Sequence, residues 1–150
     1  MNIIGPDNLL FGVDDVGACS RYLIDYGLDP VGVTETGGTF EGLDGTSVTL
    51  RGKDDTSLPP PLGTASMLRK TTYGVADASV LAAVGAELRK DREVRTLADN
   101  SIESVDDMGF VIGFQVTVRR PLDLPGELVN APGAAPQRPP NAKFSSDWSP

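Results

Sequence analysis

The sequence predicts an α+β fold made of two tandem βαβββ modules. The first observation is a repeat: residues 11–15 (FGVDD) and residues 73–77 (YGVAD) follow extended apolar runs. The second is that each copy leads into a helix-like segment, and the third is that short extended segments with turn signals follow each helix. A duplicated module provides two equivalent sets of positions at which a site could be built.

The first module begins with a strand at residues 8–13. Asp14 or Asp15 is a natural N-cap for the next helix, and Gly27 is a natural stop. Between them, apolar and aromatic side chains recur at helical spacing: Val16, Cys19, Tyr22, Leu23 and Tyr26. We expect this amphipathic helix to pack on the sheet through that face, both tyrosines included.

Three short strands complete the first module. They are expected at residues 31–35, 38–43 and 46–52, with Asp44 and Gly45 as the hairpin turn before the last one. Module 1 is therefore assigned to residues 1–52. Residues 53–66 contain three successive prolines and are assigned to a linker.

The second module, residues 67–120, repeats this order. A strand is expected at 67–75, a helix at 78–90, and further strands near 94–98, 102–106 and 110–119. Four side chains form the apolar face of its helix: Val80, Leu81, Val84 and Leu88. Residues 121–150 hold seven of the twelve prolines and are assigned to a C-terminal arm.

Composition excludes several function classes. A net charge of −8 argues against a nucleic-acid partner or an anionic membrane surface. Cys19 is the only cysteine, and we find no leader or long apolar run, so a cytoplasmic protein is expected. The chain has no histidine, which removes the commonest transition-metal ligand and the commonest general base.

These motifs, occurring twice in one order, resemble the vicinal-oxygen-chelate superfamily over roughly residues 8–119. That superfamily includes glyoxalase I, fosfomycin and bleomycin resistance proteins, and extradiol ring-cleaving dioxygenases. The resemblance implies curved mixed sheets around a shared cup, with the helices outside. Residues 129–133 and 137–141 look like the proline-rich connector after the first half of bacterial extradiol-dioxygenase-like proteins, a half that has generally lost its metal site.

The resemblance also locates the family's metal ligands, at fixed offsets from the valine of each repeat and from each turn glycine. The valines are Val13 and Val75, and the turn glycines are Gly45 and Gly109. In this sequence the ligand positions are Asn8, Thr49, Lys70 and Gly113. Lysine is cationic at neutral pH and glycine has no side chain, so the set suits no metal of the family type. We therefore expect no metal and no other cofactor in this chain.

Alternation along the strands predicts which side chains line the cup, because residues two apart share a face. If the apolar faces pack on the helices, seven polar side chains face the cup: Asn8, Thr49, Arg51, Lys70, Thr72, Gln115 and Thr117. Such a cup favours a polar or anionic small molecule. The alternative is that these residues are only the solvated faces of half-buried sheets.

Other chemistry-bearing residues have simpler interpretations. Cys19 and Ser20 lack a histidine base and are expected to pack in the core or on the helix. The acids at helix starts and turns, Asp77 and Asp106 among them, are expected to be caps. Trp148 could anchor the arm to a partner surface.

Three functions remain open from the sequence. The first is a metal-free half of an extradiol-dioxygenase-like assembly, structural or ligand-binding, completed by a second two-module chain. The second is a homodimer that binds and sequesters a small molecule, as bleomycin-resistance proteins do. The third is a metal-independent lyase or isomerase that transfers protons through Lys70 or Glu41.

Overall fold

The computed structural model describes residues 2–123, 127–128 and 137–138. The chain divides into two compact units, Met1–Arg119 and Arg120–Pro150. In the second unit, β9 (Glu127–Leu128) and β10 (Gln137–Arg138) pair antiparallel. Trp148 and residues 129–133 lie outside the described residues. The finer division into modules, linker and arm stays a prediction.

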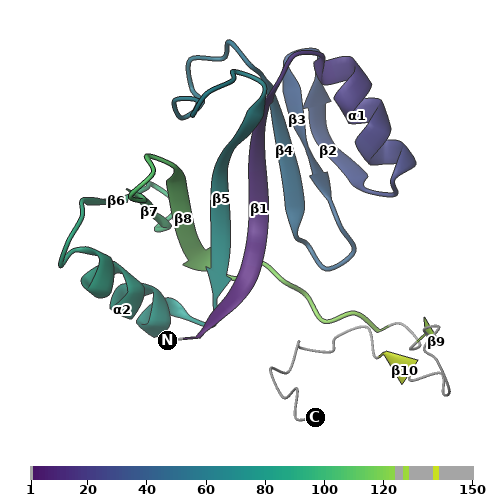
Figure 1. The fold of residues 1–150 in the computed structure, drawn as a ribbon. Helices are drawn as coiled ribbons and strands as arrows, with labels where there is room; N and C mark the ends of the chain where they lie inside the picture. The colour runs from purple at the N-terminus through teal and green to yellow at the C-terminus, as the bar shows by residue number, and fades with distance from the viewer. Residues whose placement is uncertain (1, 124–126, 129–136, 139–150) are drawn as a thin grey trace, which may run out of the picture. The chain divides into compact units, whose positions relative to one another are not determined.

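The first unit contains two βαβββ modules, which confirms the predicted α+β class. Module 1 comprises β1 (Ile3–Val13), α1 (Val16–Asp25), β2 (Asp29–Thr34), β3 (Gly37–Glu41) and β4 (Ser47–Gly52). Module 2 comprises β5 (Met67–Val75), α2 (Ala78–Leu88), β6 (Val94–Thr96), β7 (Ile102–Val105) and β8 (Val111–Val116). Figure 1 shows α1 beside the strands of module 1 and α2 beside those of module 2.

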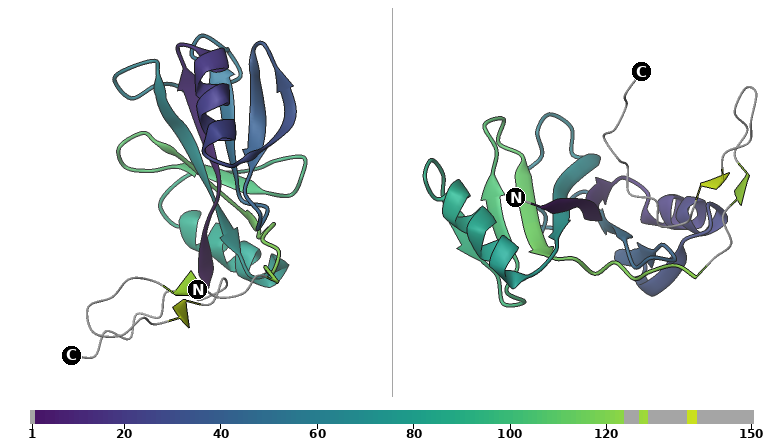
Figure 2. Two further views of the ribbon diagram at one scale, coloured as in Figure 1. Left: turned by 90° about the vertical axis from the view of Figure 1, so that its right-hand side faces the viewer. Right: turned by 90° about the horizontal axis from the view of Figure 1, so that it is seen from below.

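All eight strands form one mixed sheet in the order β2-β3-β4-β1-β5-β8-β7-β6. Within each module the first and last strands run parallel, β1 with β4 and β5 with β8. The modules join where β1 and β5 pair antiparallel at the centre of the sheet. Viewed from below, the two helices lie at opposite ends of this sheet (Figure 2).

Both helices begin at the predicted aspartates. The Asp15 carboxylate accepts a hydrogen bond from the Ala18 backbone N–H at 2.8 Å. Asp77 accepts from the backbone N–H groups of Ser79 and Val80 at 2.8 and 2.9 Å. Each carboxylate satisfies N–H groups that the first helical turn leaves without partners, which confirms the capping role.

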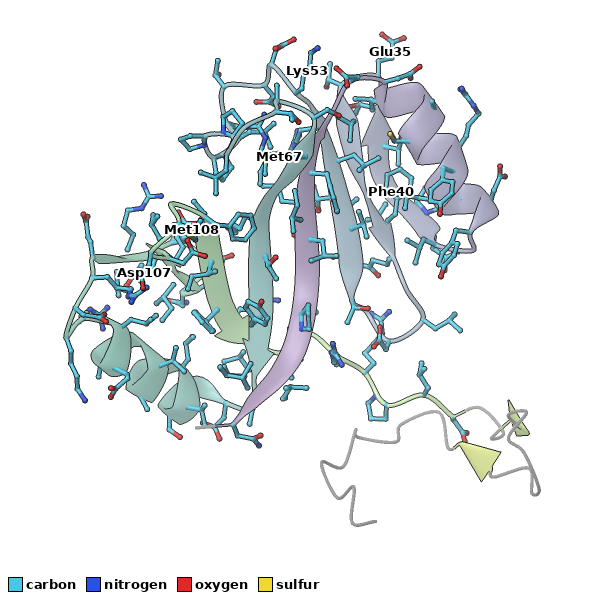
Figure 3. The ribbon with its side chains drawn as sticks, viewed as in Figure 1. Glu35, Phe40, Lys53, Met67, Asp107 and Met108 are labelled. Carbon is cyan, nitrogen blue, oxygen red and sulfur yellow. The ribbon has the colours of Figure 1, made fainter. Side chains whose placement is uncertain are left out.

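Each module has its own apolar core between its helix and the sheet. In module 2 the buried residues are Val75, Leu81, Val84, Ile102 and Phe114. In module 1 they are Val13, Phe40 and Leu50, and Phe40 is fully buried (Figure 3). Among the described residues, no helix combines the length and the apolar character needed to cross a membrane.

The tyrosines of α1 do not pack on the sheet as expected. Tyr22 is 65% exposed and Tyr26 is 76% exposed, and their rings stack on each other with centroids 6.2 Å apart. Cys19 and Leu23 instead pack partly against the core of module 1. The helical period was therefore correct, but the apolar face that contacts the sheet is narrower than predicted.

The strand boundaries differ most from the expectation at β1 and β8. β1 begins at Ile3 rather than at residue 8, because Gly5 and Pro6, typical of turns, lie inside the strand at irregularities in its pairing with β5. β8 ends at Val116 rather than at residue 119. The next residues leave the ladder because Thr117, Val118 and Arg119 donate hydrogen bonds to the side chain of Asp7.

Two of the three irregularities in the central pairing of β1 and β5 are bulges at equivalent positions of the repeat. Asp7 has no partner in β5 because Pro6 pairs with Tyr73 and Asn8 with Thr72. Arg69 has none in β1 because Leu10 pairs with Lys70 and Phe11 with Leu68. Asp7 and Arg69 are 62 residues apart, the same spacing as the repeat. A bulge redirects a side chain, and here each bulge directs a charged group into the protein.

Candidate functional site

A pocket of about 330 Å³ lies on the sheet face opposite the helices. Thr49 and Arg51 of β4 face it, whereas Val48 and Leu50 of the same strand pack towards α1. Strands β1, β4, β5 and β8, the β4–β5 segment and the β6–β7 turn all contribute. The lining residues are Asn8, Leu10, Thr49, Arg51, Ser57, Leu58, Lys70, Thr72, Leu97, Asp99, Ser101 and Gln115.

Most of the predicted cup residues converge on this pocket. Six of the seven line it: Asn8, Thr49, Arg51, Lys70, Thr72 and Gln115. Thr117 is not among the lining residues, and its hydroxyl donates to Asp7 at 3.1 Å. Glu41, one of the two candidate proton-transfer groups, lies on β3 and is also not among them. Their roles towards a ligand stay predictions.

The module 1 wall of the pocket is tied together by short polar contacts. The Asn8 amide nitrogen donates to the hydroxyls of Ser47 and Thr49 at 2.8 and 2.9 Å. The Thr49 hydroxyl also lies 3.1 Å from that of Thr39 on β3. These contacts join β1, β4 and β3 through their side chains, so this wall is held in one arrangement before any ligand enters.

Lys70 is neutralised by a carboxylate of module 2. Its ammonium nitrogen lies 2.9 Å from Oε2 of Glu103, and the side chains are 20% and 10% exposed. The other Glu103 oxygen accepts a hydrogen bond from Arg95. Lys70 is therefore one end of a three-residue ion-pair network, and its charge offers less attraction to an anion than the sequence indicates.

The β6–β7 turn brings a second carboxylate to the pocket. Asp99 accepts hydrogen bonds from the Ser101 hydroxyl at 2.6 Å and from the Ser101 backbone N–H at 3.0 Å. The Ser101 hydroxyl is the main cause that holds the pKa of the Asp99 carboxyl below its ordinary value, and its backbone N–H acts in the same direction. Asp99 is therefore an anion at neutral pH.

Sequence reasoning missed the contribution of the β4–β5 segment, which supplies Ser57 and Leu58 to the pocket. Arg69 holds this segment in place, donating to the backbone carbonyl groups of Lys53, Pro59 and Ala65. Arg69 is only 3% exposed. The prolines predicted a passive linker, and the anchoring arginine was hidden in a strand beside the more conspicuous Lys70.

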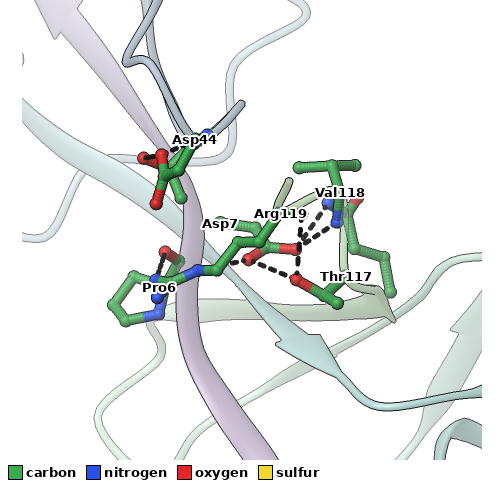
Figure 4. A network of polar contacts seen from close by, with 8 residues as sticks. Pro6, Asp7, Asp44, Thr117, Val118 and Arg119 are labelled. Carbon is green, nitrogen blue, oxygen red and sulfur yellow. Dashed lines mark hydrogen bonds and ion pairs between the residues drawn. The ribbon is translucent and has the colours of Figure 1, made fainter. Parts of the chain in front are cut away.

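Asp7 has the matching role for the segment after β8, which it binds through Thr117, Val118 and Arg119 (Figure 4). Its carboxylate is 1% exposed and accepts from the Gln115 amide at 3.2 Å, the Val118 N–H at 3.0 Å and Arg119 Nε at 3.3 Å. Gln115 lines the pocket, so Asp7 positions one of its polar groups. In the sequence, the repeat glycine Gly74 was the signal that a side chain packs closely here. A Cβ at Gly74 would lie 2.5 Å from both Asp7 carboxylate oxygens.

The four positions that the resemblance assigns to metal ligands do not fit a metal. A Cβ at Gly113 would meet the Thr72 hydroxyl at 3.1 Å and the Lys70 side chain at 3.4 Å, so other side chains fill that space. Lys70 is paired with Glu103, and Asn8 directs its amide nitrogen at Thr49. Within the described ranges, no three histidine, cysteine, aspartate or glutamate side chains are grouped so as to hold a metal ion.

Comparison with known proteins identifies the fold. A scan against models of protein families and a search of curated protein sequences each found no match. Among solved structures, the Mn(II)-bound glyoxalase from Novosphingobium aromaticivorans matches with a TM-score of 0.60 and 17% identity. That match covers 81% of this chain and 42% of the glyoxalase chain.

Two dioxygenase structures match in the same way. Homoprotocatechuate 2,3-dioxygenase from Arthrobacter globiformis gives a TM-score of 0.58 at 17% identity, covering 77% of this chain and 37% of that one. An extradiol ring-cleaving dioxygenase from B. fuscum gives 0.59 at 16% identity, with 80% and 34% covered. The chain therefore has the vicinal-oxygen-chelate fold, as its motifs indicate, and it spans between a third and a half of the length of these proteins.

Proposed function

We propose that this chain is a non-catalytic, ligand-binding half of an extradiol-dioxygenase-like assembly, without a metal site of its own. The observation that carries the proposal is the pocket on the helix-free face of the sheet. Its polar lining comes from both modules, and the positions that would hold the family metal carry Asn8, Thr49, Lys70 and Gly113. The fold has kept a concave binding surface with donors and acceptors suited to a small molecule.

A proton-transfer enzyme is less well supported by the same geometry. Lys70 is held by Glu103, which also binds Arg95, so no free amine is presented to a substrate. Glu41 is not among the residues that line the pocket. A general base must reach the proton that it removes. Lys70 lines the pocket but is held in an ion pair, and Glu41 does not line the pocket.

The solved structures that match support an assembly with further modules. The matched glyoxalase and dioxygenase chains are more than twice as long as the part that aligns. We propose a second two-module chain, or a second copy of this chain, as the partner, and the cytoplasm as the compartment. Light scattering coupled to size exclusion tests this: we expect a mass of two chains or more, and a mass of one chain for the purified protein contradicts a homodimer.

Elemental analysis tests the metal-free part of the proposal. The full chain is dialysed against excess Fe(II), Mn(II) or Zn(II), then against buffer, and its metal content is measured. We expect much less than one ion per chain, because the donor set lacks the carboxylates and imidazoles that these ions select. One tightly held ion per chain, lost in a Thr49→Val variant, would overturn the proposal.

A further inference from the structure

We infer that the pocket takes a small organic anion, such as a monocarboxylate with an apolar body, and that Arg51 is the group that binds its charge. The inference rests on the proposed ligand-binding function and names the class of ligand.

Arg51 is the cation that remains available in the pocket. Among the described residues its side chain forms no ion pair and donates no hydrogen bond, and Asp55 acts on it only by longer-range attraction. Lys70, the other cation in the lining, is already paired with Glu103. A guanidinium group can bind a carboxylate through two parallel hydrogen bonds, which fixes the orientation of the ligand as well as its charge.

The pocket also has an apolar wall suited to the body of such a ligand. Leu10 comes from β1, Leu58 from the segment after β4, and Leu97 from the turn after β6. Leu58 is kept there because Arg69 anchors its segment, and because Gly12 leaves room: a Cβ at Gly12 would lie 3.0 Å from Leu58 Cδ1. A volume of about 330 Å³ is at the lower end of the range for small-molecule sites.

The carboxylates of module 2 limit how much negative charge the ligand can carry. Asp99 lines the pocket as an anion, and Glu103 lies behind Lys70. A second negative group on the ligand would approach one of them, and like charges repel. We therefore expect a monoanion to bind in preference to inorganic phosphate.

Methyl NMR of the full chain tests this inference, with cyclohexanecarboxylate as the probe and neutral cyclohexanecarboxamide as its match in shape. We expect the carboxylate to shift the methyl signals of Leu10, Leu58 and Leu97, and to bind about tenfold more tightly than the amide. Inorganic phosphate should not displace it.

Arg51→Gln should weaken carboxylate binding about tenfold and leave binding of the amide unchanged. Arg51→Lys keeps the charge but not the two parallel hydrogen bonds, so its affinity for the carboxylate should lie between those of the unchanged protein and Arg51→Gln. Arg21→Gln removes an exposed cation from α1 outside the pocket and should change nothing. Arg51 has no partner among the described residues, so its variants should fold, which the backbone amide spectrum checks.

The outcomes separate this inference from the function on which it rests. Equal binding of carboxylate and amide at the same methyl groups overturns the anion assignment and leaves a ligand pocket. Unchanged carboxylate affinity in Arg51→Gln overturns the role of Arg51. If neither probe shifts the pocket methyl groups, the inference fails, whereas the metal and mass measurements above still decide the wider proposal.

Discussion

The two modules share one topology but differ in how their equivalent positions are used. Asp7 in module 1 and Arg69 in module 2 are both bulge residues, both buried, and each binds the segment that leaves the other module's last strand. Their charges are opposite, so their partners differ: Asp7 takes N–H and O–H donors, and Arg69 takes carbonyl oxygens. Duplication kept the position and the task, while the chemistry diverged.

The cores show a second difference. In module 2, Phe114 stacks on Tyr73 with ring centroids 5.7 Å apart. In module 1 the corresponding pair is Leu50 and Phe11, since Leu50 and Phe114 each lie five residues after a turn glycine. An apolar hollow of about 350 Å³ remains there, lined in part by Cys19 and Leu23. Module 1 is therefore the less completely packed module, although both have the same fold.

The largest expected effect comes from removing the Asp7 charge. Asp7→Asn replaces a buried carboxylate that accepts several hydrogen bonds, one of them from Arg119, with an amide that cannot accept them all. We expect the free energy of unfolding to fall by about 3 kcal/mol. Denaturant unfolding measures it, and a loss below about 1 kcal/mol would show that the network contributes little.

The repeat glycines give a matched pair of variants with the next largest effect. A Cβ at Gly74 would lie 2.5 Å from both oxygens of the buried Asp7 carboxylate, so Gly74→Ala should destabilise the protein by about 2–3 kcal/mol. At Gly12 the contacts are less severe: a Cβ would lie 3.0 Å from the movable end of Leu58 and 3.1 Å from both Arg69 Nε and the Ala65 carbonyl oxygen. Gly12→Ala should therefore cost less, about 1–2 kcal/mol. Equal losses in the two variants would contradict the proposed division of roles.

Exchanging the core residues tests the packing difference. Phe114→Leu should cost about 1 kcal/mol because it removes the ring contact with Tyr73. Leu50→Phe should be neutral or stabilise by up to about 1 kcal/mol, since the ring can enter the apolar hollow. Thermal unfolding of both variants measures this, and a large loss from Leu50→Phe would mean that the hollow cannot accept a ring.

The smallest effect is a change in pH dependence at the cap of α2. The Ser79 hydroxyl, followed by the Val80 N–H, holds the pKa of Asp77 below its ordinary value. The stabilisation is therefore complete above the unfolded pKa of about 3.9, and it is lost as the pH falls through the lower folded pKa. Asp77→Asn should reduce the slope of stability with pH in this acidic range.

Ser79→Ala is the milder companion of that variant. It removes the main cause of the shift and keeps the carboxylate, so it should reduce the same slope by a smaller amount. Unfolding free energies measured between about pH 2 and pH 5 give both slopes. Slopes identical to that of the unchanged protein would show that the cap is not coupled to pH.

The repeat and the alternation of side chains were enough to predict much of this fold and half of the pocket lining. Residues 67–75 match β5 at both ends because Met67 follows a proline-rich segment and Val75 precedes a capping acid. Thr49 and Arg51 were placed on the pocket face because period-2 alternation is fixed once one face of a strand is known to be apolar.

What could not be predicted depends on register between distant strands. Lys70 and Glu103 are 33 residues apart and meet only because β8 lies between β5 and β7. Asp7 follows Gly5 and Pro6, which predict a turn, and its burial depends on a bulge that alternation does not show. A sequence pattern gives the face of a side chain, and the partners across the sheet decide its charge environment.

Relaxation measurements with Mn(II) test directly whether the positions that the resemblance assigns to metal ligands hold no metal in this chain. Substoichiometric Mn(II) is added to the isotope-labelled full chain, and the broadening of each backbone amide signal is recorded. We expect no selective broadening at Thr49 and Gly113, because the family positions offer neither a carboxylate nor an imidazole. Selective broadening centred on those two amides would contradict it.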